Sequence, residues 1–422
     1  MLLIDSIHPL RVGLKAAALA ASVLMAGAAH AADDATTAPT WTFGGYGTVG
    51  VVHADTSQAD FTSSILKADG AGYTHRWSDT VDTRVGAQVG ASLNKQWSAV
   101  LQVVSEQGLD KSFRPRVEWA NVKYQVTPDL ALRLGRISLP MYLAADYRKI
   151  GYAFTFVRNP IEVYNAIPIS SSDGIDLTYR WHTGSIKHVG QLFYGHNDVR
   201  LIDPFRAKSR ALAGFSYTAE SGPLTIRVSA MTARLTVNIA EDLFDAFRQF
   251  GPAGAAIAER YAVNDKRTTG FSIGATYDPG QWYISSEAGH FDARSFFAAT
   301  TAAYATAGYR WGNFTPYLSA AKIYSNDPTT SEGLPPAALP AQLRPTAGYL
   351  NAALNGLLTT IPVQSSVTAG MRWDCMTNVA VKLQYDRVRP HAGSRGTLIN
   401  QQPDFRSGQV VNVASAVLDF VF

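Results

Sequence analysis

The sequence lacks the features that mark a disulfide-stabilised secreted protein or a familiar enzyme. Cys375 is the only cysteine among 422 residues, so no intramolecular disulfide can form. The histidines show no metal-ligand spacing, and neither an H-E-x-x-H nor a G-x-S-x-G motif occurs. We therefore expect no enzymatic activity, no metal site and no cofactor.

An excess of one charge and long apolar runs are also missing. The chain carries 37 basic and 33 acidic residues, a formal net charge of +4, which gives no reason to expect nucleic-acid binding. Hydrophobic residues make up 46% of the chain. Beyond the N-terminus, however, no run approaches the roughly twenty residues of a membrane-spanning helix. Two classes remain, a soluble all-β protein and a membrane barrel whose apolar residues alternate with polar ones.

The N-terminus has the layout of a secretory signal peptide. Arg11 and Lys15 precede an apolar run that is too short to span a membrane in the mature protein, and small residues follow, up to Ala31. The pattern predicts a signal peptide over residues 1–31 and a mature domain over 32–422. A short membrane anchor is the alternative.

Most of the remaining chain alternates apolar and polar residues with the period of β-strands. We expect about sixteen strands, an even number in the range of bacterial outer-membrane barrels. They are expected at 41–52, 81–93, 97–104, 117–126, 130–136, 174–181, 185–194, 210–218, 224–234, 269–277, 282–290, 302–311, 314–323, 366–373, 379–387 and 409–422.

The connections between these strands alternate strictly between tight turns and long loops. Tight turns rich in Gly, Asn, Asp and Pro are expected at 94–96, 127–129, 182–184, 220–223, 278–280, 312–313 and 374–378. Long connections are expected at 53–80, 105–116, 137–173, 195–209, 235–268, 291–301, 324–365 and 388–402. This alternation places all tight turns at one end of an up-and-down barrel, as in outer-membrane barrels.

Tryptophan placement supports a membrane barrel independently. Six of the eight tryptophans lie at the expected tight-turn end, where indole rings favour the interface between membrane and water; they are Trp41, Trp97, Trp181, Trp282, Trp311 and Trp373. Two long loops also contain helical patterns, at 241–250 and 349–358. We interpret these as helices that pack the loops, with partner-binding helices as the alternative.

The last strand ends on Phe422, with alternate apolar residues before it. It resembles the C-terminal strand of Gram-negative outer-membrane barrels, whose terminal Phe is read by the barrel-assembly machinery. The chain as a whole resembles the porin family of sixteen-stranded barrels. The resemblance rests on FGGYGTVGVV at 43–52, LRLGR at 132–136, the terminal strand and the order of these segments.

The resemblance implies an all-β transmembrane antiparallel barrel in the outer membrane, assembled as a homotrimer with one pore per subunit. It also implies that the third long loop, 137–173, folds into the barrel. The acidic tip common in that loop of general porins is absent, and ADYRKIGYAFTFVRNPIEVYN stands at 145–165 instead. Loop charges therefore cannot be carried over from other porins.

Strand parity predicts which charged residues line the barrel interior, because charges on the lipid face are costly, by roughly 2–4 kcal/mol for Arg or Lys at mid-bilayer. The predicted pore-lining and constriction residues are mostly basic on the wall and balanced in charge on the loop. They are Arg84, Lys123, Arg133, Asp176, Arg180, Arg227, Arg310, Arg372 and Lys382 on the wall, with Asp146, Arg148, Arg158 and Glu162 on the loop. This excess of basic residues suggests a mild preference for anions.

The sequence thus favours a porin, a water-filled channel for passive diffusion of small hydrophilic solutes and ions. Two alternatives remain. One is a substrate-specific channel in which Tyr142, Tyr147 and Tyr152 guide the solute. The other is an adhesin or receptor barrel that acts through the long loops at 235–268 and 324–365.

Overall fold

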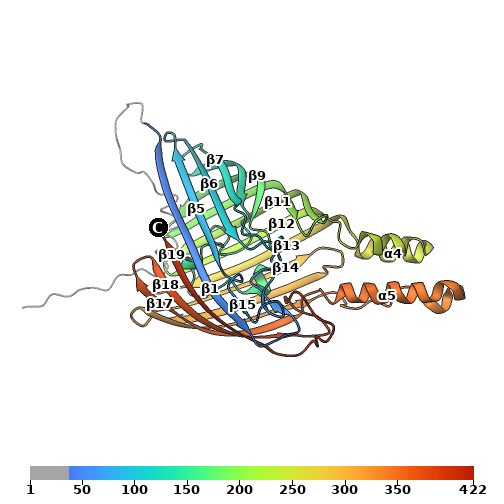
Figure 1. Ribbon diagram of the computed structural model, residues 1–422. Helices are drawn as coiled ribbons and strands as arrows, with labels where there is room; N and C mark the ends of the chain where they lie inside the picture. Colours follow the sequence, from blue (N-terminus) through green and yellow to red (C-terminus); the bar gives the residue numbers. More distant parts are fainter. Residues whose placement is uncertain (1–37) are drawn as a thin grey trace, which may run out of the picture.

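The structure, a computed structural model, describes residues 38–422 and is a closed antiparallel β-barrel (Figure 1). Sixteen long strands form the wall, as expected from the alternation. They are β1 (Thr40–Ala54), β5 (Arg84–Ser92), β6 (Trp97–Glu106), β7 (Arg116–Gln125), β8 (Leu130–Ser138), β9 (Ser171–Thr183), β10 (Ile186–Arg200), β11 (Arg206–Ser221), β12 (Leu224–Val237), β13 (Val263–Tyr277), β14 (Trp282–Asp292), β15 (Ala299–Tyr309), β16 (Phe314–Ser325), β17 (Gln364–Met376), β18 (Val379–Pro390) and β19 (Val411–Val421).

The first and last long strands close the barrel. β1 pairs with β5 through its first half and with β19 through its second, so that Gly45 faces Ala87 and Val51 faces Ala416. The two-residue strand β4 (Trp77–Ser78) also joins β1, and β2 (Asp60–Phe61) pairs with β3 (Ala71–Gly72) in the first long connection. Closure leaves the wall of sixteen long strands without a free edge for pairing with other chains.

Tight turns and longer connections alternate around the barrel, as expected from the sequence. The connections expected at 195–209 and 291–301 are shorter than predicted, because the flanking strands extend and leave only residues 201–205 and 293–298 between them. Turns such as 184–185 and 222–223 join neighbouring strands at one end, and the long connections lie at the other end. Figure 1 shows α4 (Gly251–Tyr261) and α5 (Arg344–Leu358) projecting from the long-loop end, away from the C-terminus. No helix within residues 38–422 is long and apolar enough to cross a membrane.

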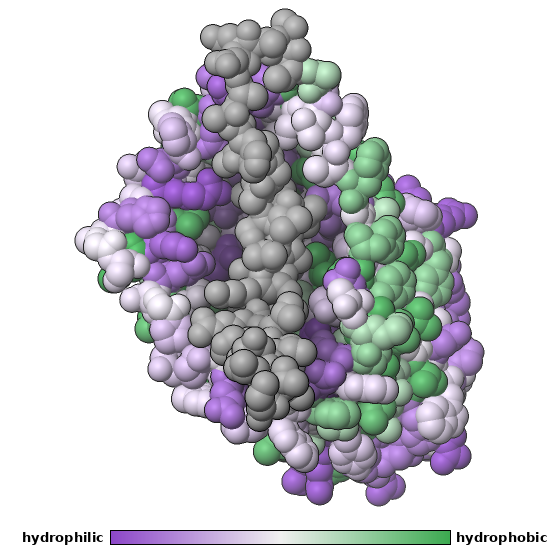
Figure 2. Space-filling view, turned by 90° about the vertical axis from the view of Figure 1, so that its left-hand side faces the viewer, coloured by the Kyte–Doolittle hydropathy of each residue, from purple (hydrophilic) through white to green (hydrophobic). Residues whose placement is uncertain are grey.

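The outer surface of the wall is apolar. Leu192, Leu318 and Leu383 are among the strand residues that expose large hydrophobic side chains. Hydrophobic side chains gather on one flank of the molecule in Figure 2. Aromatic rings cluster near the short turns, where Trp181 stacks on His188 and Phe314 stacks on Trp373. This arrangement matches the aromatic girdle of an outer-membrane barrel.

The third long connection, residues 139–170, lies inside the barrel, as the resemblance to porins implied. Met141 and Tyr164 of this segment share a buried apolar cluster with Leu212 of β11, Tyr304 of β15 and Ile323 of β16. Such a cluster requires the segment to enter the barrel, because the strands that contribute to it form much of the interior wall. We call residues 139–170 the inner loop.

A second apolar core lies at the long-loop end, outside the barrel. Helix α3 (Glu241–Arg248) contributes Phe244 and Phe247, and α5 contributes Leu350 and Leu354. The helical patterns at 241–250 and 349–358 are therefore confirmed as helices, and the two helices pack their long loops together through this shared core. Helix α4 was not predicted, because its glycines disfavour a helix. Its proline lies in the first turn, where a helix tolerates it. We call α3, α4, α5 and their core the cap.

Candidate pore constriction

The inner loop leaves β8 at Ser138 and returns to the wall at β9. Its path includes the short helices η1 (Gly151–Ala153) and α2 (Ile161–Tyr164). On the far wall Glu287 of β14 holds the loop at two points. Its Oε1 accepts hydrogen bonds from Tyr164 of the loop at 2.6 Å and Tyr304 of β15 at 2.9 Å, and its Oε2 accepts the Leu143 backbone N–H at 2.6 Å. The loop therefore reaches across the interior.

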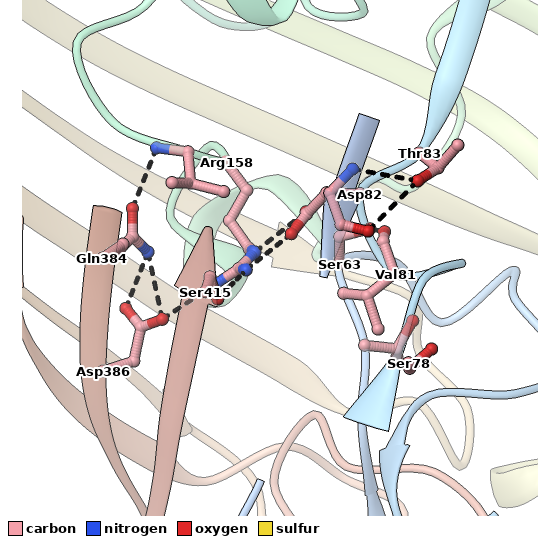
Figure 3. Close-up of polar contacts among 12 residues, drawn as sticks. Ser63, Ser78, Val81, Asp82, Thr83, Arg158, Gln384, Asp386 and Ser415 are labelled. Carbon is pink, nitrogen blue, oxygen red and sulfur yellow. Dashed lines mark hydrogen bonds and ion pairs between the residues drawn. The ribbon is translucent and has the colours of Figure 1, made fainter. Parts of the chain in front are cut away.

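Arg158 anchors the middle of the inner loop to β18, β19 and the segment that precedes β5 (Figure 3). Its Nε and Nη2 donate to the two oxygens of Asp82 at 3.0 and 2.6 Å. Nη1 donates to Asp386 Oδ2 at 2.8 Å, and Nη2 donates to Ser415 Oγ at 2.5 Å. The guanidinium also lies 5.0 Å from the centre of the Phe61 ring. It is therefore a buried cation with two carboxylate partners.

Arg158 also changes the pKa of Asp82, which precedes β5. Burial would raise the pKa of the Asp82 carboxyl, but the charge and hydrogen bonds of Arg158, helped by Arg84 and Lys67, lower it below its usual value. Asp82 is completely buried. The ionised carboxylate in this site therefore depends on Arg158.

Two wall cations also bind the backbone of the inner loop. Lys382 of β18 is completely buried, and its Nζ donates to Gly151 O at 2.7 Å and forms an ion pair with Asp419 at 2.8 Å. Arg372 of β17 donates through Nη1 to Tyr152 O at 2.6 Å and to Phe154 O at 2.8 Å. Arg372 thus supplies a donor to two buried loop carbonyls, whereas Lys382 adds a second donor to Gly151 O, which also accepts the Phe154 backbone N–H at 3.0 Å.

Two cations of the inner loop hold the loop itself in shape. Arg148 donates through Nη1 to Ile167 O at 2.9 Å and through Nη2 to Tyr164 O at 2.5 Å. Lys149 forms an ion pair with Glu106 at the end of β6. These contacts clamp the start of the loop to its end and to the wall.

Glu162 of α2 is a buried carboxyl that forms no ion pair with any cation of residues 38–422. Gln364 Nε2 of β17 donates to its Oε1 at 2.7 Å. Burial raises the pKa of Glu162 above its usual value, and the hydrogen bonds from Gln364 and Ser366 offset only part of that effect. The carboxyl lines a small cavity together with Phe156 and Ser319.

The wall formed by β7, β8 and β9 carries cations that the inner loop does not bind. Lys123 lies directly across from Arg133, and Arg133 lies across from Asp176. Arg133 holds the buried Asp176 through Nη2 at 2.7 Å, and its own side chain stays 23% exposed. Arg180 lies on the same face of β9 as Asp176, and Lys123 and Arg180 are both half-buried. These residues form a continuous basic surface.

Asp146 is the inner-loop carboxylate closest to this basic surface. Ser138 donates to Asp146 Oδ1 at 2.7 Å, and Arg227 Nη1 of β12 lies 3.7 Å from Asp146 Oδ2. The surrounding interior would raise the pKa of Asp146, but Arg227 and Arg133 lower it. The side chain keeps 44% exposure. Asp146 is therefore an ionised group that reaches water beside the basic wall.

The remaining predicted residues lie nearer the ends of the barrel. Arg310 pairs with Asp278 at 2.7 Å in the turn between β13 and β14, and Arg84 donates to Asp82 O at 3.3 Å. The structure therefore separates the predicted set into residues that fix the loop or a turn and residues that stay half-exposed. Sequence reasoning missed the partners Gln384, Ser415 and Tyr304, which have no local motif. Within the described part of the chain, no group of three His, Cys, Asp or Glu side chains could hold a metal ion.

Comparisons with known proteins agree with this geometry. The family described as Gram-negative porin matches residues 16–397. The fold is similar to the anion-selective porin from Comamonas acidovorans (12% identity, TM-score 0.53, covering 91% of this chain and 100% of that one). It is also similar to Salmonella typhi OmpF in complex with daunomycin (14%, 0.52, 90% and 97%) and to the trimer form of Vibrio cholerae OmpT (11%, 0.50, 92% and 100%). No curated protein matches the sequence.

Proposed function

Because the chain belongs to the Gram-negative porin family and is therefore an outer-membrane channel, we propose that it passes small hydrophilic solutes and ions with a mild preference for anions. The proposed passage lies between the inner loop and the wall of β7, β8 and β9. The apolar cluster and the buried anchors of the loop support this position, because they engage mainly β10 to β19 and β1. They touch β8 only at its end, through Ile137 and Ser138, and bind none of Lys123, Arg133 and Arg180.

The observation that carries the anion preference is the basic surface of Lys123, Arg133 and Arg180. Its members lie on three adjacent strands and face one buried carboxylate, Asp176, which Arg133 already binds. A wall with excess positive charge inside a low-dielectric shell concentrates anions and repels cations. Asp146 on the loop side would oppose this surface and set a transverse field across the passage.

The test is ion selectivity in planar lipid bilayers. We expect Lys123→Gln combined with Arg180→Gln to lower the chloride-to-potassium permeability ratio about twofold or more, measured from the reversal potential in a KCl gradient. Arg133 is kept in this variant so that buried Asp176 keeps its partner. The matched control is Lys95→Gln combined with Arg344→Gln, which removes two exposed charges from a turn and from the cap. Equal permeability ratios in both variants and the wild type would contradict the anion preference.

A receptor role of the long loops is the second candidate function. The cap supports it, because its apolar core gives the loops at 238–262 and 326–363 an ordered shape outside the barrel. Swelling of proteoliposomes in sugars of graded size separates a diffusion channel, a solute-specific channel and a receptor. A diffusion channel admits small sugars and excludes large ones, a solute-specific channel admits one class, and a receptor with a filled barrel admits none.

We also propose how the chain reaches and occupies the membrane. A homotrimer is supported by the trimer form of the similar Vibrio cholerae protein. The exposed ring of Phe422, which ends the strand that closes the barrel, supports recognition by the barrel-assembly machinery. The predicted signal peptide, 1–31, lies outside the described residues and stays a prediction. Family membership supports a channel without enzymatic activity.

A further inference from the structure

Three arginines form a row on the outer surface of the barrel, near the long-loop end. Arg210 of β11 lies directly across from Arg234 of β12, and Arg234 lies directly across from Arg267 of β13. All three are exposed. On β13, Arg267 has the parity of Phe271 and Ile273, whose exposed side chains belong to the lipid-facing surface. The row therefore faces away from the pore.

The height of this row matches the boundary of the membrane. From Tyr277 at the short-turn end to Arg267, β13 rises roughly 34 Å at about 3.4 Å per residue. A strand tilt of about 40° converts this to roughly 26 Å, close to the height of about 25 Å for the apolar band of outer-membrane barrels. Thr232 and Thr269 fill the level between the row and the last apolar residues, such as Phe271. The arginines thus lie at the level of the outer-leaflet headgroups.

The row carries more positive charge than the protein compensates. Side chains directly opposite each other on paired strands lie about 5 Å apart, and like charges at that spacing repel. Arg234 has one partner, Asp265, at 2.9 Å. Arg210 and Arg267 form no ion pair with any residue in 38–422. A fixed row of this kind is suited to an anion with two or more charges that spans neighbouring strands.

We propose that Arg210, Arg234 and Arg267 bind the phosphate groups of the phosphorylated glycolipid that forms the outer leaflet of a Gram-negative outer membrane. Arginine suits this ligand because its planar group can donate two hydrogen bonds to one phosphate. Clusters of basic side chains at the membrane surface recognise anionic lipid headgroups in the same way. The acyl chains of the glycolipid would then lie along the apolar surface around Phe215 and Phe271, directly below the row.

The test compares lipid binding to the folded barrel in detergent by native mass spectrometry. The probes are diphosphoryl lipid A, its dephosphorylated form and phosphatidylglycerol. We expect wild type to bind diphosphoryl lipid A at least tenfold more tightly than the variant Arg210→Gln, Arg234→Gln, Arg267→Gln. This difference should shrink at 1 M salt, where exposed charges are screened. The control variant Arg114→Gln, Arg344→Gln, Arg406→Gln removes the same charge from exposed loops and should bind like wild type.

Channel conductance serves as a check that the triple variant folds. Because the row faces away from the passage, the triple variant should keep wild-type conductance. If the triple variant does not fold, the single variant Arg267→Gln, which breaks no ion pair, replaces it. The expected loss of lipid A affinity is then smaller. Equal binding of lipid A by wild type and the folded variant would overturn the proposal. Equal binding of the phosphorylated and dephosphorylated lipids would also overturn it. A change in oligomeric state without a change in lipid binding would instead assign the row to a contact between subunits.

Discussion

Replacing Arg158 by alanine should release the middle of the inner loop from the wall. The substitution removes both ion pairs of a buried cation and leaves Asp82 and Asp386 without it. Removing one partner of a buried ion pair costs about 3–5 kcal/mol, because the remaining charge stays desolvated. Asp386 keeps hydrogen bonds from Thr368 and Gln384, whereas Asp82 loses both hydrogen bonds that its side chain accepts from Arg158. We therefore expect a loss of about 3–5 kcal/mol, with Asp82 responsible for most of it.

Two measurements check this expectation. The free energy of unfolding in lipid vesicles, followed by tryptophan fluorescence in urea, should fall by the stated amount, and single-channel recordings should show larger current fluctuations as the loop moves. Adding Asp82→Asn to the variant should restore part of the stability, since the neutral amide needs no cation. An Arg158→Ala variant that unfolds within about 1 kcal/mol of wild type and conducts with the same noise would refute the anchoring role.

The pH dependence of stability provides an independent check on the same pair. The pKa of Asp82 is lowered in the folded state, so its contribution is present above the unfolded pKa of about 3.9 and is lost as the pH falls through the folded pKa. Wild type should therefore lose this contribution only in strong acid. The variant without Arg158 should lack this part of the acid dependence, and parallel curves for the two proteins would contradict the pairing.

Two further substitutions in the inner loop have defined outcomes. In Gly151→Ala the new Cβ would lie 2.2 Å from Asp419 Oδ1 and 2.4 Å from Thr48 Oγ1. We therefore expect the free energy of unfolding in urea to fall by about 1–3 kcal/mol and the conductance to change. Wild-type values for both would show that the loop has room to shift. The folded pKa of Glu162 is raised, so its stabilising contribution is present below the unfolded pKa of about 4.3 and is lost as the pH rises through the folded pKa. Glu162→Gln should match wild type near pH 4 and be more stable than wild type at pH 8, and an equal difference at both pH values would be the contrary result.

The barrel was predictable because its determinants are local. Alternation with a period of two sets which residues face lipid, and turn formers at every second connection set the direction of each strand. Strand ends were less accurate. Val81 and Asp82 were expected in a strand, but β5 begins at Arg84, because Asp82 turns inward to meet Arg158. That departure depends on a residue from another loop and has no pattern in the nearby sequence.

The site was predictable only as a set of inward-facing charges. Strand parity placed Lys382 inside the barrel and the resemblance to porins placed Arg158 there, but the contact between Arg158 and Asp386 of β18 joins positions 228 residues apart. No spacing rule connects such residues, since the strand register and the path of the inner loop bring them together. Tyr304 and Gln384 were missed for the same reason, because a lone Tyr or Gln in a strand is ordinary.

Inward-facing cations therefore serve two different purposes in this barrel. Arg158 and Lys382 are buried and neutralised by carboxylates, so their charge contributes to loop position and little to the field that a passing ion experiences. Lys123 and Arg180 bind no inner-loop group and stay half-exposed, so their charge remains available to the passage. Because the two groups share no partner, their substitutions should act independently. Selectivity can then be changed through the exposed cations without loosening the loop, whereas a change at the buried cations disturbs the shape of the passage first.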